Sequence, residues 1–141
     1  MQEEKIKKIV RERYSKIAKE KTSCCPTCGP CGIDVIEQAK NIGYSEEELR
    51  NIPESAIMGL GCGNPTALAD LKKGETVLDL GAGAGIDVFL AANKVGSRGH
   101  VIGIDMTEEM IKIANETAKK YGYENVEFKL GEIENLPLED N

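Results

Sequence analysis

The 141-residue sequence lacks several features that define whole classes of protein. No apolar run approaches the roughly 18–20 residues that a membrane-spanning helix needs, so no membrane partner is expected. The first ten residues, MQEEKIKKIV, are charged and hold no signal-peptide core, which predicts a soluble, cytoplasmic chain. The 15 glycines follow no collagen-like period, and an apolar share of 40% argues against a mostly disordered chain.

Catalytic pairs are also missing, and cations are in the minority. The single histidine, His100, opens a predicted strand, and nothing in the chain offers a nucleophile–base pair. A net charge of −6 argues against nucleic acid as a partner, because phosphate contacts need clustered cations. The charge is uneven, however: residues 1–21 carry eight Lys/Arg against four Glu, and residues 107–141 carry four Lys against nine acids. A basic first helix fits RNA binding, and it fits equally a solvated face that covers a core.

Cysteine is the unusual component that is present. Cys24, Cys25, Cys28 and Cys31 lie within eight residues, and Cys62 stands apart. Without signs of secretion, thiol chemistry or metal binding is favoured over structural disulfides. Soft thiolates suit zinc, iron–sulfur clusters, cuprous ions and trivalent metalloids, but the two separated pairs that zinc prefers are missing. A flexible loop that is cysteine-rich by chance is the alternative.

Hydrophobic periodicity predicts helices in the first half of the chain and alternating strands and helices in the second. In the first half, helices are expected over 2–21, 33–41, 65–71 and, after a capping box at Ser45–Glu48, up to Pro53. Strands are expected at Thr76–Leu80, His100–Asp105 and Asn125–Leu130, separated by helices over 85–95 and 107–121, the second capped by Thr107. Apolar strands separated by helices indicate an α/β fold with a parallel sheet covered on both faces.

The segment VLDLGAGAGID, from Val77 to Asp87, carries the strongest motif. A strand is followed by Gly81, Gly83 and Gly85 and then by a helix. Such a turn lets the backbone approach a ligand closely and presents amide groups at a helix N-terminus. The dinucleotide fingerprint would need glycine where Ile86 stands, so a pyrophosphate ligand is disfavoured.

An acid, three alternating glycines and a second acid at the end of the next strand resemble the cofactor motif of S-adenosyl-L-methionine-dependent methyltransferases with a Rossmann-like fold. Asp79 is placed to hold the ammonium group of the cofactor, and Asp105 the ribose hydroxyls. The resemblance puts Glu132 near the adenine. Alternatively, Asp105 caps a helix and Glu132 is an ordinary surface acid. The full set of implied cofactor-binding residues is Asp79, Gly81, Ala82, Gly83, Gly85, Asp105, Met106, Glu132 and Ile133.

Over nearly its whole length the sequence resembles the arsenite methyltransferases. The glycine loop identifies only the superfamily, whereas LGCGNP, from Leu60 to Pro65, is the specific part. The segments that carry the resemblance are VRERYSKIAK (10–19), SCC (23–25), GYS (43–45), LGCGNP (60–65), VLDLGAGAG (77–85), VIGIDM (101–106) and LGEIENLP (130–137).

The resemblance implies methyl transfer from S-adenosyl-L-methionine to arsenite, or to its thiol conjugates, held by cysteine thiolates in the presence of a thiol reductant. Cys62 matches a functional cysteine of the family, as an arsenic ligand or redox partner, and Cys24 and Cys25 match its cysteine-rich segment. Cys62 is otherwise a small residue tolerated in a Gly-Cys-Gly turn. A methyltransferase with another acceptor and a thiol-based metal- or metalloid-binding module are the competing functions.

The resemblance also implies a domain division. Residues 1–60 form an N-terminal helical, cysteine-rich extension, and residues 61–141 form the first half of a Rossmann-like domain with about three parallel strands. The family continues with more strands and two further functional cysteines. The chain alone is therefore expected to bind arsenite weakly, to transfer no methyl group, and to self-associate through an uncovered apolar edge or face of its sheet.

Overall fold

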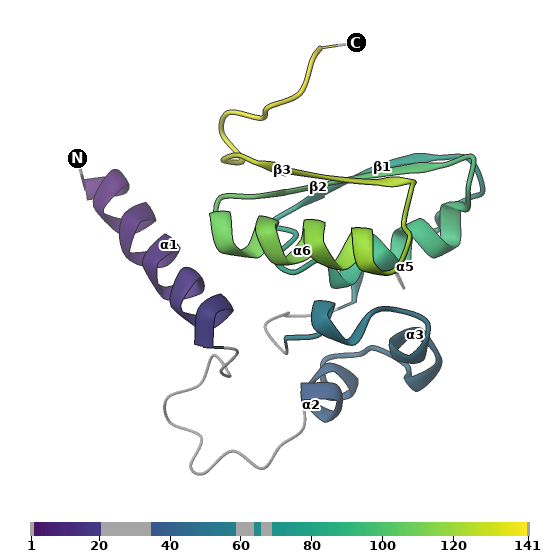
Figure 1. Cartoon of the computed structure of the whole chain (residues 1–141). Coiled ribbons are helices and arrows are strands. Elements are labelled where there is room, and N and C mark those ends of the chain that lie inside the picture. The colour runs from purple at the N-terminus through teal and green to yellow at the C-terminus, as the bar shows by residue number, and fades with distance from the viewer. Residues whose placement is uncertain (1, 21–34, 59–63, 66–68, 141) are drawn as a thin grey trace.

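The computed structural model describes residues 2–20, 35–58, 64–65 and 69–140 (Figure 1). All five cysteines and residues 66–68 of the helix expected over 65–71 lie outside these ranges, and the described residues 69–71 are not helical, so that helix ends earlier than predicted. No described helix has the length and the apolar character needed to cross a membrane.

Three parallel strands form the sheet in the second half of the chain. They are β1 (Thr76–Leu80), β2 (His100–Asp105) and β3 (Val126–Leu130), paired in the order β1-β2-β3. The predicted bounds of β1 and β2 are confirmed, and β3 begins one residue later than predicted. The α/β class with a partial Rossmann-like sheet is therefore confirmed.

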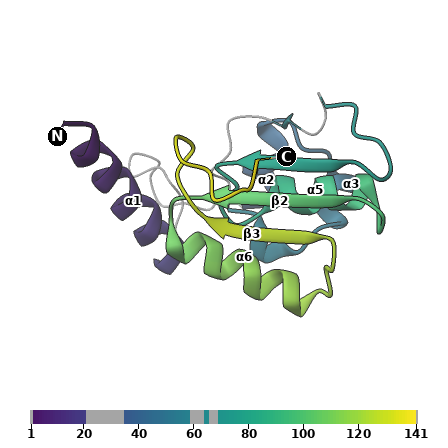
Figure 2. The ribbon, with the colours of Figure 1, turned by 90° about the horizontal axis from the view of Figure 1, so that it is seen from above.

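Two helices connect the strands, α5 (Ile86–Val95) and α6 (Glu108–Lys120), and both lie on the same face of the sheet (Figure 1). The expectation of a sheet covered on both faces is therefore wrong for the described residues. On the opposite face residues 131–140 turn back over the ends of the strands (Figure 2), while Leu78 and Leu80 are 41% and 44% exposed. The expected uncovered apolar face is thus present.

The first half of the chain packs against this unit. It contains α1 (Gln2–Glu20), α2 (Val35–Asn41), α3 (Glu46–Arg50) and a short 3-10 helix, η1 (Glu54–Ala56), which was not predicted. The predicted capping box is confirmed, with Ser45 Oγ accepting from the Glu48 amide and the Glu48 carboxylate accepting from the Ser45 amide. The η1 segment contacts α6, where Ser55 Oγ lies 2.8 Å from Thr117 Oγ1.

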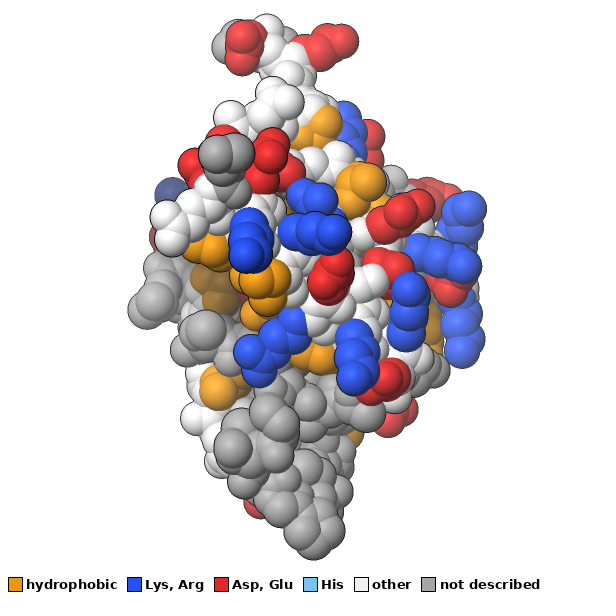
Figure 3. All heavy atoms as spheres, turned by 90° about the vertical axis from the view of Figure 1, so that its left-hand side faces the viewer, with side chains coloured by type: hydrophobic (Ala, Val, Ile, Leu, Met, Phe, Trp, Pro, Cys, Tyr) orange, Lys and Arg blue, Asp and Glu red, His pale blue; other side chains and the backbone are white. Residues whose placement is uncertain are grey.

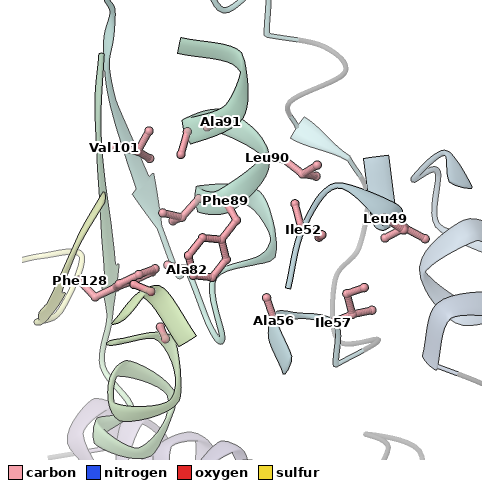
Figure 4. Close-up of a cluster of buried hydrophobic side chains, with 14 of the residues drawn as sticks. Leu49, Ile52, Ala56, Ile57, Ala82, Phe89, Leu90, Ala91, Val101 and Phe128 are labelled. Carbon is pink, nitrogen blue, oxygen red and sulfur yellow. The ribbon is translucent and has the colours of Figure 1, made fainter. Parts of the chain in front are cut away.

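One hydrophobic core joins the two halves of the chain (Figure 4). At its centre Phe89 of α5 lies against Phe128 of β3, with ring centroids 5.7 Å apart. Side chains from the first half belong to the same buried cluster; they are Ala39, Tyr44, Leu49, Ile52, Ala56 and Ile57. Burial of this apolar surface fixes the extension against the sheet.

Candidate functional site

The glycine loop makes the turn between β1 and α5. Gly81, Gly83 and Gly85 have φ angles of 76°, 56° and 100°, the left-handed region that glycine enters without steric cost. The Gly81 and Ala82 amides both donate to the Ile104 carbonyl, at 2.8 and 2.9 Å, so the loop is fastened to β2. This bonding sets the loop at the carboxyl edge of the sheet.

The three glycines differ in what surrounds them. A Cβ placed on Gly81 or Gly83 meets no atom within 4 Å, whereas one on Gly85 would lie 2.9 Å from Phe128 Cζ and 2.9 Å from Phe89 Cε2. Gly85 is therefore required for packing onto the core. Gly81 and Gly83 leave open space at the point where a ligand would approach the backbone.

Asp105 ends β2 beside this loop, as predicted. Its Oδ2 accepts from the Gly83 amide at 3.0 Å, and its Oδ1 accepts from the Thr107 amide at 2.8 Å. Asp105 thus orders both the loop and the start of α6. Thr107 occupies the N-cap position of α6 as predicted, although its side chain makes no cap hydrogen bond. Because a carboxylate can accept about four hydrogen bonds, Asp105 keeps capacity for ligand hydroxyls.

Asp79 lies deeper than its neighbours in the site. Its Oδ2 is buried and has no hydrogen-bond partner within the described part of the chain. Burial, helped by the charges of Asp87 and Asp105, raises the pKa of Asp79 to about 7. A buried carboxylate oxygen without a donor is costly when it is ionised, and a cationic group held nearby would offset part of that cost.

A pocket of about 450 Å³ opens above the carboxyl ends of the three strands. This volume lies within the usual range for small-molecule sites, about 300–1,000 Å³. Its wall comes from both halves of the chain. The described residues that line it are Lys7, Tyr14, Ala39, Ile42, Tyr44, Ala56, Met58, Gly81, Ala82, Gly83, Ala84, Ile86, Asp87, Ile104, Asp105, Met106, Thr107, Met110, Gly131, Glu132, Ile133 and Glu134.

Tyr44 and Asp87 are among the lining residues that the sequence analysis did not assign to the site. Tyr44, from the loop between α2 and α3, donates its hydroxyl to Asp87 Oδ1 at 2.7 Å. Burial raises the pKa of Asp87, and the bond from Tyr44 partly opposes that rise. Asp87 ends the glycine motif, which was a usable signal, but nothing local in the sequence pairs it with a tyrosine 43 residues earlier.

Glu132, which the resemblance puts near the adenine of the cofactor, lines the pocket and also binds α1. Its two oxygens accept from Lys7 Nζ at 3.0 Å and from Arg11 Nη2 at 2.7 Å. Met106 and Ile133 line the same pocket. The predicted cofactor residues therefore gather around one cavity, except that Asp79 lies behind the lining and Gly85 lies in the core contact.

The cysteines predicted to bind metalloid, Cys24, Cys25 and Cys62, lie outside the described residues. Within the described ranges no group of three or more His, Cys, Asp or Glu side chains could hold a metal ion. His100 sits at the start of β2, with its Nε2 3.4 Å from Glu127 Oε2, and does not line the pocket.

These features fit a ligand with a cationic group and with hydroxyl groups. Open space above Gly81 and Gly83 admits a ligand to the backbone, Asp105 offers acceptors for hydroxyls, and the lining is mixed apolar and acidic. In sheets of this kind ligands bind outside the carboxyl ends of the parallel strands. The fold and the site therefore define an α/β protein with a Rossmann-like small-molecule site at the carboxyl ends of its strands.

Comparison with known proteins identifies the family. A protein-family model described as "Methyltransferase domain" matches residues 71–141, half of the chain. The chain belongs to this methyltransferase family, whose cofactor is S-adenosyl-L-methionine. A SAM dependent methyltransferase from Aquifex aeolicus has a similar solved structure, 32% identical with a TM-score of 0.51, over 77% of this chain and 53% of that one.

Similarity to named relatives extends further along the chain. An arsenite methyltransferase from Halobacterium salinarum is 47% identical over 97% of this chain and 37% of its own length. A demethylmenaquinone methyltransferase from Listeria welshimeri is 36% identical, but over only 52% of this chain and 31% of its own length. The chain thus spans about a third of the length of these relatives, and it is related to the arsenite methyltransferases.

Proposed function

We propose that this chain is the cofactor-binding portion of an arsenite methyltransferase. One observation supports the acceptor: similarity to the Halobacterium salinarum arsenite methyltransferase covers 97% of the chain, well beyond the methyltransferase domain. Similarity to the menaquinone enzyme covers 52%. Residues outside the cofactor domain are therefore what favours arsenite.

In this proposal residues 1–60 form the helical, cysteine-rich extension and residues 61–141 the first half of the Rossmann-like domain. The cofactor is held by the open loop at Gly81 and Gly83, with Asp105 toward the ribose. Glu132 is assigned to the adenine side, and Met106 and Ile133 line the same pocket as further cofactor-binding residues. S-adenosyl-L-methionine supplies an electrophilic methyl group on a sulfonium.

The protein's own groups then have mainly to bind and orient the acceptor. Trivalent arsenic carries a lone pair and has no proton to lose, so the site needs positioning groups more than a general base. Cys62 is proposed as an arsenic ligand or redox partner, with Cys24 and Cys25 in a supporting role. Arsenite and a thiol reductant are the proposed partners, and methyl transfer is assigned to a protein of the relatives' full length.

The experiment that tests this proposal is arsenite binding by the purified chain in the presence of a thiol reductant. We expect weak binding that is lost in Cys62→Ser and retained in Cys28→Ser, which serves as the matched control. Cofactor binding without Cys62-dependent arsenite binding would indicate another acceptor. Bound zinc or iron in elemental analysis, without cofactor binding, would indicate a metal-binding module. Arsenite turnover by the 141-residue chain itself would contradict the assignment of catalysis to the longer protein.

A further inference from the structure

We propose that Asp87, oriented by Tyr44, is the carboxylate that contacts the ammonium group of the cofactor's amino-acid part. The motif alone suggests Asp79 for this role, but Asp79 does not line the pocket and would affect the ligand only through its charge. The inference rests on the cofactor of the family and is independent of the methyl acceptor.

The contact between Tyr44 and Asp87 fixes the carboxylate. Tyr44 is only 3% exposed, and its hydroxyl donates to Asp87 Oδ1 at 2.7 Å. Hydrogen bonds to a charged acceptor are short and among the stronger ones in proteins. A single bond from Tyr44 therefore holds the rotamer of Asp87 while leaving lone pairs for a ligand.

Position distinguishes Asp87 from Asp79. Asp87 lies in the first turn of α5, two residues after Gly85, and lines the pocket. Asp79 is not among the lining residues, and its Oδ2 is buried. A ligand in the pocket can therefore contact Asp87 directly. It interacts with Asp79 only at longer range, through the negative charge of that carboxylate.

The charges around the pocket favour a cation at this end. Its charged lining residues are four acids, Asp87, Asp105, Glu132 and Glu134, and one base, Lys7. That base is already paired, with its Nζ 3.0 Å from Glu132 and 3.2 Å from Glu134. The carboxylates at the glycine-loop end, Asp87 and Asp105, have no basic residue beside them in the described lining, so an ammonium group would be stabilised there.

Tyr44 also links the cofactor site to the N-terminal extension. It lies outside the segment matched by the methyltransferase family model, between α2 and α3. The next helix, α3, contains Glu48, whose Oε2 accepts a hydrogen bond from Asn64 Nδ2 at 3.0 Å. This bond connects α3 to the part of the chain that precedes β1. The extension therefore orients a cofactor-binding group in addition to covering the pocket.

Binding of two related probes to the purified chain tests this assignment. S-adenosylhomocysteine carries the ammonium group, whereas 5′-methylthioadenosine lacks the whole amino-acid part. By calorimetry we expect Asp87→Asn to weaken S-adenosylhomocysteine about tenfold or more, and Tyr44→Phe about threefold or more, since each removes part of a charge-assisted contact. Binding of 5′-methylthioadenosine should stay within about twofold of the wild type, because its contacts remain intact.

Matched controls are Tyr123→Phe, whose hydroxyl lies 3.3 Å from Asn93 away from the pocket, and the exposed Asp70→Asn. If Asp87→Asn lost equal affinity for both probes, or lost no affinity for S-adenosylhomocysteine, the proposed role of Asp87 would be overturned. A probe-selective loss in Asp79→Asn but not in Asp87→Asn would return that role to Asp79. If Asp87→Asn does not fold, the probe ratio for Tyr44→Phe decides. Failure of the wild type to bind either probe would overturn the cofactor site itself.

Discussion

Gly83 and Gly85 are two residues apart and share a left-handed backbone, yet an added methyl group would meet different surroundings. At Gly83, with φ of 56°, the new Cβ enters the open space of the pocket. At Gly85, with φ of 100°, it lies 2.9 Å from Phe128 Cζ. One position is thus open for a ligand, and the other is filled by the core.

We expect Gly83→Ala to cost about 1 kcal/mol of folding free energy, from backbone strain alone, and to weaken cofactor binding about tenfold. Gly85→Ala should cost about 2–4 kcal/mol, because overpacking adds to the strain. Urea unfolding and calorimetry measure the two effects. Gly122→Ala, with φ of 71° and no atom within 4 Å of the new Cβ, is the control for strain alone. Equal destabilisation at positions 83 and 85 would contradict the distinction.

Asp79 gives a pH-dependent contribution to stability whose sign is fixed by its environment. The folded pKa of about 7 lies above the ordinary value near 3.9, so the folded state binds a proton that the unfolded state has released. The free energy of unfolding should therefore fall as pH rises from about 4 to about 7 and level off above. Asp87 and Asp105 face the same carboxylate and add to the effect; Tyr44 lies beside Asp87.

The variant Asp79→Asn tests this prediction, because the amide cannot ionise. At pH 8 we expect it to unfold with a free energy on the order of 2–4 kcal/mol higher than the wild type, in the absence of ligand. Near pH 4, where the wild-type carboxyl is protonated, the two proteins should be about equal. Denaturant unfolding at several pH values measures the difference. A difference that does not change with pH would count against ionisation of Asp79 as its cause.

At the scale of elements, α1 closes one side of the pocket through ion pairs. Lys7 and Arg11 meet Glu132, and Lys19 Nζ lies 3.0 Å from Glu109 Oε1 at the other end of the helix. Hydrogen bonds from the side chains of Ser15 and Lys19 lower the pKa of Glu109 to about 2. The uneven charge of the sequence is thereby explained in part: basic residues of α1 lie against acids from the end of the chain.

Weakening these pairs should loosen α1. We expect Lys7→Gln/Arg11→Gln to weaken the docking of α1 and to speed amide exchange in this helix, because both ion pairs to Glu132 are lost. High salt should screen these ion pairs and raise the rate of amide exchange in the wild-type helix toward that of the variant. Hydrogen exchange with mass spectrometry measures both.

The control for α1 is Lys8→Gln/Lys16→Gln, whose partners, Glu12 and Glu20, lie within the same helix. The outer face of α1 shows lysines and arginines interspersed with acids (Figure 3). Equal acceleration of exchange in the control would show that charge loss in general, rather than docking to Glu132, loosens the helix.

At the scale of the whole molecule, local patterns predicted more than long-range contacts did. The apolar strands, the alternate glycines and the Ser45 capping box each act within a few residues, and all three were predicted correctly. The packing of the extension onto the pocket depends on pairs far apart in sequence, such as Tyr44 with Asp87 and Arg11 with Glu132, separated by 43 and 121 residues. No periodicity encodes such pairs, so Asp87 and the wall formed by α1 were missed.

The exposed apolar side of β1 leads to the last prediction, self-association of the 141-residue chain. β1 is an edge strand of the described sheet, and Leu78 and Leu80 on its uncovered side are 41% and 44% exposed. Edge strands with exposed apolar side chains are prone to pair with another copy.

We expect light scattering to show oligomers whose fraction rises with protein concentration. Leu78→Lys/Leu80→Lys should shift the population to monomer, because lysine on an edge strand opposes pairing. Ile6→Lys, at a position on α1 that is 57% exposed, should not change the oligomer fraction. A wild type that stays monomeric at high concentration, or a response to Ile6→Lys as large as to the β1 variant, would contradict association through this face.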